Sequence, residues 1–477
     1  MPEQSSACPR CAELEKVVAA LREEVRALRE ELKQVPVLRE EIRELRARLN
    51  LSSKNSSKPP SSDPPWFPKP PANPTGRKQG GQPGHPGAKR AEFRATEIDH
   101  RFEIEPERCE KCKESLARAR VCEPEVVQVV DLPPVAAEVT EYTLATKCCP
   151  GCGHVTTAPL PAEVEGAIGL RFQAVLAVLV GRFRLSRREV QEAALALFGP
   201  KARVSLGWIS VLEQRTAQAL LPAYVEIEAA VRASPVVNAD ETSWRERRKS
   251  AWLWHASTPG LSLYRIHPRR NREAFERLLG EDFKHLLVSD RWSVYRCLSK
   301  RMRQICWAHL KRNFQELVDR GGPSVKVGQE GLDILCEVML ALDAHRKNGT
   351  TLATLSRCLS PLRLRMFKMI QRGTKNEDVD ARKLCRDLEV LFPCLWTFAR
   401  VKGVPITNNL AERRLRPAVL WRKTSFGTHS PAGSRFAERM MTVVQTLRAQ
   451  GRSILDFVAA ALRAAMGGRR MPSALPP

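Results

Sequence analysis

Three acidic residues have the types and surroundings that phosphate chemistry with two metal ions requires. Asp240 and Asp290 each end a short apolar run that predicts a buried strand, and strand ends are where ligands gather in such sheets. Glu412 falls in the first turns of a helix predicted to begin near Thr407 or Asn408. Buried carboxylates repel one another, and a divalent cation such as Mg²⁺ or Mn²⁺ removes that cost. Three are about the smallest set for attack on a phosphodiester.

Taken singly, these acids have simpler explanations. An aspartate at a strand end is typically a cap for the following turn, and a helical glutamate is typically solvated. The hypothesis of a shared site therefore depends on the three residues as a set. Glu438 is the next candidate for the third acid if Glu412 does not fill that role.

Basic residues are concentrated around the third acid. Residues 401–477 contain 13 lysines and arginines against 3 acids. Carboxylates repel DNA, so a site that acts on DNA needs cations nearby to hold the phosphates. The predicted DNA-binding residues are Arg413, Arg414, Arg416, Arg422 and Lys423.

Two C-x-x-C pairs form a second group with ligand chemistry: Cys109 with Cys112, and Cys149 with Cys152. Each pair presents two thiolates to one tetrahedral ion, so together they predict a Zn²⁺ site. The residues between them, including the β-like run 126–130, would form a ribbon of short strands. Cys148 adjoins Cys149 and is an alternative ligand.

Two further cysteine patterns are weaker. Cys8 and Cys11 have no second pair nearby, and they are either exposed thiols or half of a zinc site shared across a dimer. Cys306 and His309 lie three positions apart on a predicted helix. Two ligands do not make a structural zinc site, so these residues are predicted to pack beside Asp290.

The elements that must position these groups differ along the chain. Apolar residues follow alternating four- and three-residue steps from Leu14 to Leu49, with one slip at Pro36, where the helix is expected to break or kink. This seam predicts a coiled coil that makes the protein a homodimer or a higher oligomer; the alternative is an amphipathic helix packed on its own protein. Residues 52–90 are rich in Ser, Pro and Gly and carry seven Lys/Arg against one acid, which predicts a basic linker.

The central part alternates strands and helices. A strand is expected to end at Asp240, a hairpin to join 250–257 and 261–267, and another strand to end at Asp290. Helices are expected at 168–183, 187–198 and 206–225, and the last two allow a helix-turn-helix with Ser205 as N-cap. The predicted domains are a coiled-coil helix 1–51, a linker 52–100, a zinc-binding ribbon 101–160, a helical DNA-binding domain 161–232, a catalytic core 233–320, a helical insertion 321–404, and the rest of the core with basic helices 405–477.

The overall charge indicates the class of partner. The chain has 477 residues and a net charge of +25, which makes a polyanion such as nucleic acid the expected ligand. No apolar stretch reaches the roughly 18 residues of a membrane span, and the N-terminus lacks a secretory pattern. The 14 cysteines are therefore expected to be reduced thiols or metal ligands in a cytoplasmic protein that associates with the nucleoid when bound to DNA.

Several of these segments resemble one known family. Residues 239–244 (ADETSW) resemble the first-aspartate motif of the insertion-sequence sixty-six family of bacterial DDE transposases. As a set the matches are specific, and they follow the family's order over nearly the whole chain. Thr407 is a departure, since the family more often has an acidic residue there. The other matching segments are 289–295, 306–312, 407–417, 421–423, 426–427, the leucine-periodic N-terminus, 52–63 and 80–85.

The resemblance implies an RNase H-like α/β catalytic domain in which Asp240, Asp290 and Glu412 hold two Mg²⁺ ions. It also implies a zinc finger at the cysteine pairs, and a transposase that binds terminal inverted repeats, cleaves there and joins the 3′-hydroxyl to target DNA. Small accessory transposition proteins accompany many members of the family. Two alternatives stay open: a zinc-containing transcription factor without catalysis, and an RNase H-like nuclease specific for a DNA structure.

Overall fold

The computed structural model describes residues 9–49, 51–52, 55, 91–120, 122, 125–161, 164, 166–467 and 470–476. Most of the predicted linker and Cys8 lie outside these residues, and the side chain of Cys11 is not described either. The chain divides into two compact units, one made of 1–63, 140–194 and 203–477, the other of 64–139 and 195–202. Within the described residues, no helix combines the length and the apolar character that a membrane span requires.

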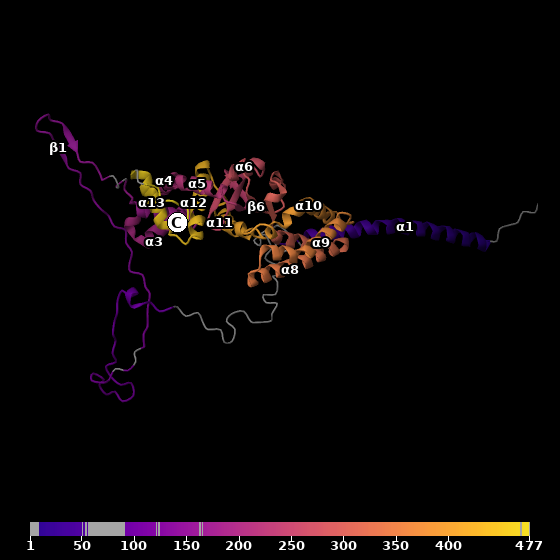
Figure 1. The fold of residues 1–477 in the computed structure, drawn as a ribbon, viewed down its shortest axis with the longest axis horizontal. Coiled ribbons are helices and arrows are strands. Elements are labelled where there is room, and N and C mark those ends of the chain that lie inside the picture. Colours follow the sequence, from indigo (N-terminus) through magenta and orange to yellow (C-terminus); the bar gives the residue numbers. More distant parts are fainter. Residues whose placement is uncertain are drawn as a thin grey trace, which may run out of the picture. The chain divides into compact units, whose positions relative to one another are not determined.

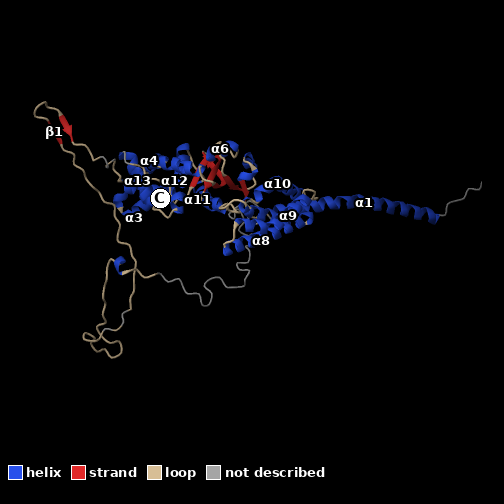
Figure 2. Ribbon diagram, viewed as in Figure 1, coloured by secondary structure: helices blue, strands red, loops and turns tan. Residues whose placement is uncertain are grey.

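A mixed five-stranded sheet lies at the centre of the first unit, with the strands in the order β5-β4-β3-β6-β7 (Figure 2). β3, β4 and β5 run antiparallel, whereas β6 and β7 run parallel to β3. The inner strands are apolar because both faces are covered; Leu287 and Val288 of β6 are fully buried. The bounds are β3 Val236–Glu246, β4 Lys249–Ser257, β5 Ser262–His267, β6 Leu286–Ser289 and β7 Arg303–Ile305.

The first strand is longer than the sequence predicts. β3 does not end at Asp240 but continues to Glu246, because β4 pairs with it as far as Lys249. Asp240 is therefore in the middle of an antiparallel ladder, opposite His255. The predicted hairpin is confirmed as β4 and β5, and Asp290 directly follows β6 as expected.

One group of helices packs on the strands β3, β4 and β5. α11 packs on β3 and β4, and α12 packs on β5 and on α4 and α5. Ser205 caps α4 as predicted, with its side chain accepting a hydrogen bond from the N–H of Trp208. The bounds of this group are α2 Leu170–Gly181, α3 Arg187–Phe198, α4 Leu206–Ala219, α5 Leu221–Arg232, α6 Arg272–Leu279, α11 Asn409–Ser425, α12 Pro431–Ala449 and α13 Ile454–Gly467.

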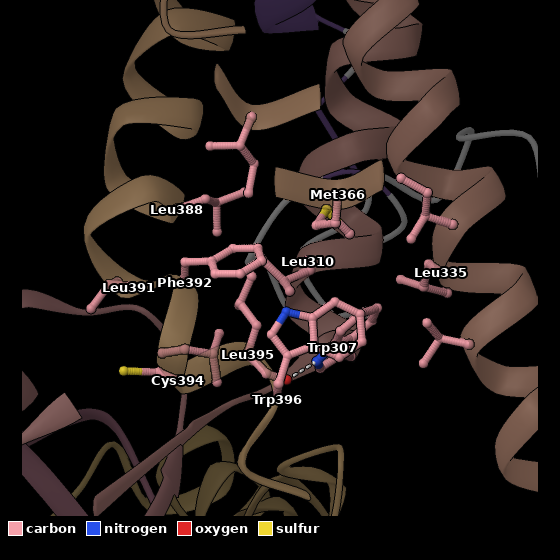
Figure 3. Close-up of a cluster of buried hydrophobic side chains, with 14 of the residues drawn as sticks. Trp307, Leu310, Leu335, Met366, Leu388, Leu391, Phe392, Cys394, Leu395 and Trp396 are labelled. Atoms are coloured by element: carbon pink, nitrogen blue, oxygen red, sulfur yellow. Dashed lines mark hydrogen bonds between the residues drawn. The ribbon is translucent and has the colours of Figure 1, made fainter. Parts of the chain in front are cut away.

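A second group of helices adjoins the β7 edge of the sheet: α7 Trp307–Arg320, α8 Val325–Asn348, α9 Leu352–Gly373 and α10 Val379–Leu395 (Figure 1). Their common core contains Trp307, Met366 and Trp396, and the Trp307 indole donates a 2.8 Å hydrogen bond to the Leu395 carbonyl (Figure 3). α7 and α8 approach closely, since a Cβ on Gly331 would lie 2.5 Å from the Phe314 ring.

The N-terminal helix α1, Pro9–Leu49, continues through Pro36, so the predicted break is wrong. Proline removes only one hydrogen bond of the helix, and the rest of the ladder holds the exposed segment together. The apolar seam is exposed in the single chain; Leu32, for example, is 72% exposed. α1 contacts α7 near its C-terminal end, where Ala47 and Arg48 lie against Glu316 and Arg320.

The predicted ribbon contains less strand than expected. β1, Thr146–Cys148, pairs antiparallel with β2, Val155–Thr157, and the described part of 101–160 holds no other strand. The run 126–130 forms no strand, and Val129 is 84% exposed. Within this run Gln128 bonds the backbone of Phe93 through its side-chain amide. β-Branched residues favour strands, but the tertiary context decides whether a strand forms.

Candidate active site

The three predicted acids come together on the inner strands of the sheet, beside the end of β6. β3 and β6 pair in parallel with Asn238 opposite Val288, so the same register sets Asp240 beside Asp290. Neighbouring strands are about 4.8 Å apart, so the two carboxylates belong to residues that lie side by side on adjacent strands. Desolvation and the charges of Glu241, Asp290 and Glu412 raise the pKa of Asp240 well above its usual value. Such mutual repulsion requires that the carboxylates lie close together.

Asp290 is fixed by its own turn. Its Oδ1 accepts a 3.0 Å hydrogen bond from the backbone N–H of Trp292. Its carbonyl oxygen accepts from the Ser289 hydroxyl at 3.0 Å and from the buried Arg303 guanidinium at 3.3 Å. The simpler interpretation of Asp290 as a turn cap is thus also satisfied.

Asn408 positions the third acid. It precedes α11, but its side chain does not cap the helix as the sequence suggested. Instead its amide donates 2.8 Å to the Ala239 carbonyl and accepts 2.9 Å from Asn238, both on β3. These bonds join the start of α11 to the strand next to Asp240, and they place Glu412 in the first turn beside the aspartates.

Cys306 and His309 lie beside Glu412 and not simply beside Asp290, as the sequence predicted. His309 Nδ1 is 3.4 Å from Glu412 Oε1, and Arg312 is 3.6 Å from the same oxygen. One ligand atom each from Cys306, His309 and Glu412 lies within 4.8 Å of the others. Burial and the charges of Arg312 and Arg291 lower the pKa of His309 to about 3, so its imidazole is neutral.

Glu241 is a site residue that sequence reasoning missed. Its side chain is almost fully buried and accepts hydrogen bonds from Arg270 and from the Tyr295 hydroxyl, each 2.5 Å long. Arg270 also lies 3.8 Å from the Trp292 ring. The sequence does show two adjacent acids, Asp240 and Glu241. Neighbouring side chains of a strand point to opposite faces, so Asp240 gave no indication of which residues Glu241 would contact.

The predicted DNA-binding residues divide into two kinds. Arg414 bonds the Thr258 carbonyl at 2.7 Å and the Ser262 hydroxyl at 2.9 Å, and thereby ties α11 to β5. Arg422 bonds the Ser243 carbonyl at 2.6 Å. The exposed cations are Arg413, Arg416 and Lys423, and none of these forms an ion pair with a described residue. The structure thus gives Arg414 and Arg422 intramolecular partners that the sequence did not reveal.

Glu438, the alternative candidate for the third acid, lies against the outer strand β5. It accepts a 2.6 Å hydrogen bond from the N–H of Ile266 on the outer strand β5. Burial raises its pKa to about 7, and its nearby charges are Arg265, Arg435 and Arg439. It is absent from the charges that act on Asp240.

Each of the two cysteine pairs forms a tight turn of its own. The N–H of Lys113 bonds the Cys109 carbonyl, and the N–H of Gly153 bonds the Cys149 carbonyl, both at 2.9 Å. Backbone N–H groups at Cys112 and Cys152 lower the pKa of the Cys109 and Cys149 thiols, respectively. Thiolates are the form that binds metal.

Cys148 differs from its neighbour. It belongs to β1, and its thiol donates to the Gly153 carbonyl at 3.3 Å. The backbone N–H groups of the turn are directed at Cys149 instead. This arrangement favours Cys149 as the ligand over Cys148.

A central strand carrying one acid, with two further acids brought beside it, defines a protein with a carboxylate site suited to divalent cations. The sequence model for the IS66 family of transposases matches residues 189–435, more than half of the chain, and the chain therefore belongs to this family. A family of unknown function, DUF6444, matches residues 12–91. The uncharacterized protein y4qI of Sinorhizobium fredii is 24% identical over 241 residues, which cover 44% of this chain and 43% of that protein. The chain thus spans less than half the length of this relative.

Proposed function

We propose that the protein binds the ends of an insertion sequence and catalyses cleavage and strand transfer of DNA. Membership of a transposase family supports the general role. The observation that carries the specific proposal is the convergence of Asp240, Asp290 and Glu412, since the charges of Asp290 and Glu412 help to raise the pKa of the buried Asp240. A protein that only binds DNA does not require buried carboxylates that lie close together and repel one another.

The sheet supports an RNase H-like catalytic domain. Three antiparallel strands are followed by two parallel ones, and the first strand, β3, lies in the centre of the order. Asp240 is on this central strand and Asp290 follows its parallel neighbour. The helices α8, α9 and α10 lie between β7 and α11 in the sequence and would form the insertion at 321–404.

The acid cluster fits divalent cations on the chemistry of its donors. Hard carboxylate oxygens suit Mg²⁺ or Mn²⁺. Glu412 Oε1 is buried and has no hydrogen-bond partner among the described residues, as expected of a ligand atom. Asp240, Asp290 and Glu412 would hold the cations. Bound there, the ions would lower the barrier to attack by water or a 3′-hydroxyl and stabilise the leaving oxygen.

The surrounding residues bind and orient the DNA. Arg413 and Arg416 are exposed on α11 near Glu412 and would hold phosphates. Arg414 keeps α11 against the hairpin, so the acids stay in register with the bound strand. Asn408 and Cys306 fix the start of that helix.

The remaining parts of the chain would form the oligomer and recognise the DNA. We infer one Zn²⁺ held by Cys109, Cys112, Cys149 and Cys152, and a homodimer or larger oligomer formed through the seam of α1. The helices of 161–232 would read the terminal repeats, including a helix-turn-helix at α3 and α4. Target DNA, and small accessory proteins where present, would complete a complex in the cytoplasm at the nucleoid. The predicted domain boundaries belong to the same proposal.

The test is cleavage and joining of a labelled element end, with a gel-shift on the same DNA. Asp240→Asn, Asp290→Asn and Glu412→Gln should each abolish both reactions in Mg²⁺ and keep or strengthen end binding, because repulsion toward phosphate falls. Glu438→Gln is the matched control and should cut normally. Cleavage without joining would favour a nuclease, and binding without any cleavage by the wild type would favour a transcription factor. Wild-type cutting by Glu412→Gln would place the third acid elsewhere.

A further inference from the structure

A hollow of about 540 Å³ lies between the far end of the β3–β4 hairpin and the C-terminal end of α11. Its volume is within the range of pockets that bind small organic groups. It is lined by three cations, Arg245, Arg422 and Lys423, together with Trp252 and Phe426. Cations beside aromatic rings are the composition that binds single nucleotides of DNA, since phosphates meet the charges and bases stack on the rings.

Phe426 is presented to solvent by a built support. It ends α11 in the left-handed conformation, with φ of 57°, and it is 76% exposed. A bulky residue with positive φ is unusual, and so is a large apolar side chain left so exposed. Neither contributes to the stability of a single chain. This combination of strain and exposure is typical of a functional position.

The next residues hold that conformation in place. Gly427 has φ of 100°, and a Cβ there would collide with the Arg245 carbonyl. The N–H of Thr428 bonds the same carbonyl at 2.9 Å, and the N–H of Arg247 bonds the Thr428 carbonyl at 2.9 Å. Phe426 is therefore fixed to the end of β3 and does not depend on a mobile loop.

The three cationic side chains of the hollow differ in their contacts within the chain. Arg422 is engaged with Thr242 and Ser243 and holds α11 against β3. Arg245 and Lys423 are exposed and form no ion pair with any described residue. Two charges on the rim are thus free to receive a phosphate without breaking a contact.

The hollow lies at a definite distance from the acids. Asp240 and Arg245 are five residues apart on β3, which is roughly 16 Å at strand rise, and this odd spacing puts their side chains on opposite faces of the strand. Glu412 and Lys423 are eleven residues apart on α11, again roughly 16 Å at helical rise. Both elements therefore lead from the acid cluster to the hollow. At about 3.4 Å per nucleotide along a strand, this distance corresponds to roughly five nucleotides.

A cation between two aromatic rings links the two places. The Arg270 guanidinium is 4.8 Å from the Trp252 ring and 3.8 Å from the Trp292 ring. The backbone N–H of Trp292 in turn donates to Asp290 Oδ1. Contacts through Arg270 and Trp292 therefore lead from Trp252, in the wall of the hollow, to the second acid.

We propose that this hollow binds an unstacked DNA base within about five nucleotides of the scissile phosphate, with the base on Phe426 and its phosphate on Arg245 and Lys423. The proposal rests on the function proposed above, because the acids define the scissile position. Its role would be to fix which phosphate lies at the carboxylates. A base held outside the stack resists sliding of the strand by one nucleotide.

The experiment uses the full-length Asp240→Asn protein and element-end DNA carrying the fluorescent base 2-aminopurine at each of the first positions beside the cleavage site. Fluorescence should change on binding at one position, because stacking on the duplex is lost there. Phe426→Ala should remove that change and weaken binding about 5- to 150-fold, the range for loss of one stacked base. Phe426→Trp should restore binding. Leu340→Ala, which removes another exposed apolar side chain (64% exposed) on α8 away from the proposed DNA-binding segments, is the matched control and should alter neither.

The outcomes separate this proposal from the proposed function. With cleavage-competent protein, Phe426→Ala should cut at several neighbouring phosphates where the wild type cuts at one. Cleavage at one position with an unchanged fluorescence signal in Phe426→Ala would overturn the pocket and leave the transposase proposal intact. A Phe426-dependent signal in a protein that never cuts would do the reverse. Unchanged thermal unfolding of Phe426→Ala, expected for an exposed side chain, shows that folding is not the cause.

Discussion

The thiol of Cys306 accepts a 3.1 Å hydrogen bond from the backbone N–H of Asn408, 102 positions later in the chain. Cys306 precedes α7, which carries His309, and Asn408 precedes α11, which carries Glu412. A second bond, from the N–H of Trp307 to the Ile406 carbonyl at 3.1 Å, reinforces the same junction. The cysteine thus fixes the helix of the third acid to the helix beside it.

Cys306→Ala should destabilise the protein by about 1–3 kcal/mol, because it leaves the buried Asn408 N–H without an acceptor. Cleavage should slow as well, since the start of α11 loses a constraint. Cys306→Ser keeps an acceptor oxygen and should recover most of both losses. Urea unfolding and single-turnover cleavage measure the two effects. Equal stability of the alanine and serine variants would show that the bond does not matter.

Glu438 should make the protein less stable as the pH rises. Its folded pKa is raised to about 7 from an ordinary value near 4.5, so the folded state holds this proton more tightly than the unfolded state. Its stabilising contribution is complete below about pH 4.5 and is lost as the pH passes 7, by about 3 kcal/mol in total. Glu438→Gln should lack this loss. Unfolding at pH 5 and pH 8 in both proteins is the measurement, and parallel profiles would refute the assignment.

The full-length chain should contain one zinc ion. Cys112→Ser and Cys152→Ser should each reduce the zinc measured by mass spectrometry of digested protein to well below one per chain, because each removes a thiolate ligand. Cys122→Ser is the control and should retain it. Cys149→Ser should lose zinc and Cys148→Ser should keep it, since the turn directs its N–H groups at Cys149. Full zinc in the Cys112 and Cys152 variants would eliminate the site.

The exposed seam of α1 should hold two or more chains together. Replacing Leu21, Val25 and Leu28 by Gln should lower the mass seen by light scattering, because these side chains are exposed in a single chain and have a narrow heptad spacing. The replaced positions are well before the end of α1 that contacts α7. Gln at Arg22, Arg26 and Arg29, outside the seam, should leave the mass unchanged. An unaltered mass in the seam variant would exclude the helix as the main contact between chains.

The sequence by itself determined the local elements and the identities of the acids. Strands and helices follow from apolar periodicity, which depends on near neighbours, so β4, β5 and α3 were predictable. The types and spacing of Asp240, Asp290 and Glu412 indicated divalent-cation chemistry before any fold was known. The end of β3 was mispredicted because apolar pattern stops at Asp240, whereas the strand continues through its pairing with β4.

Only the tertiary structure decided which partners these residues have. The contacts of Asn408 with β3, of Cys306 with Asn408 and of Glu241 with Tyr295 join positions 54 to 169 residues apart. No local pattern encodes such pairs, because they arise from the register of parallel strands and the docking of α11. The same holds for Arg414, whose sequence indicates a DNA contact. Packing turns its guanidinium inward to the carbonyls of the hairpin, where hydrogen bonds compensate for its lost hydration.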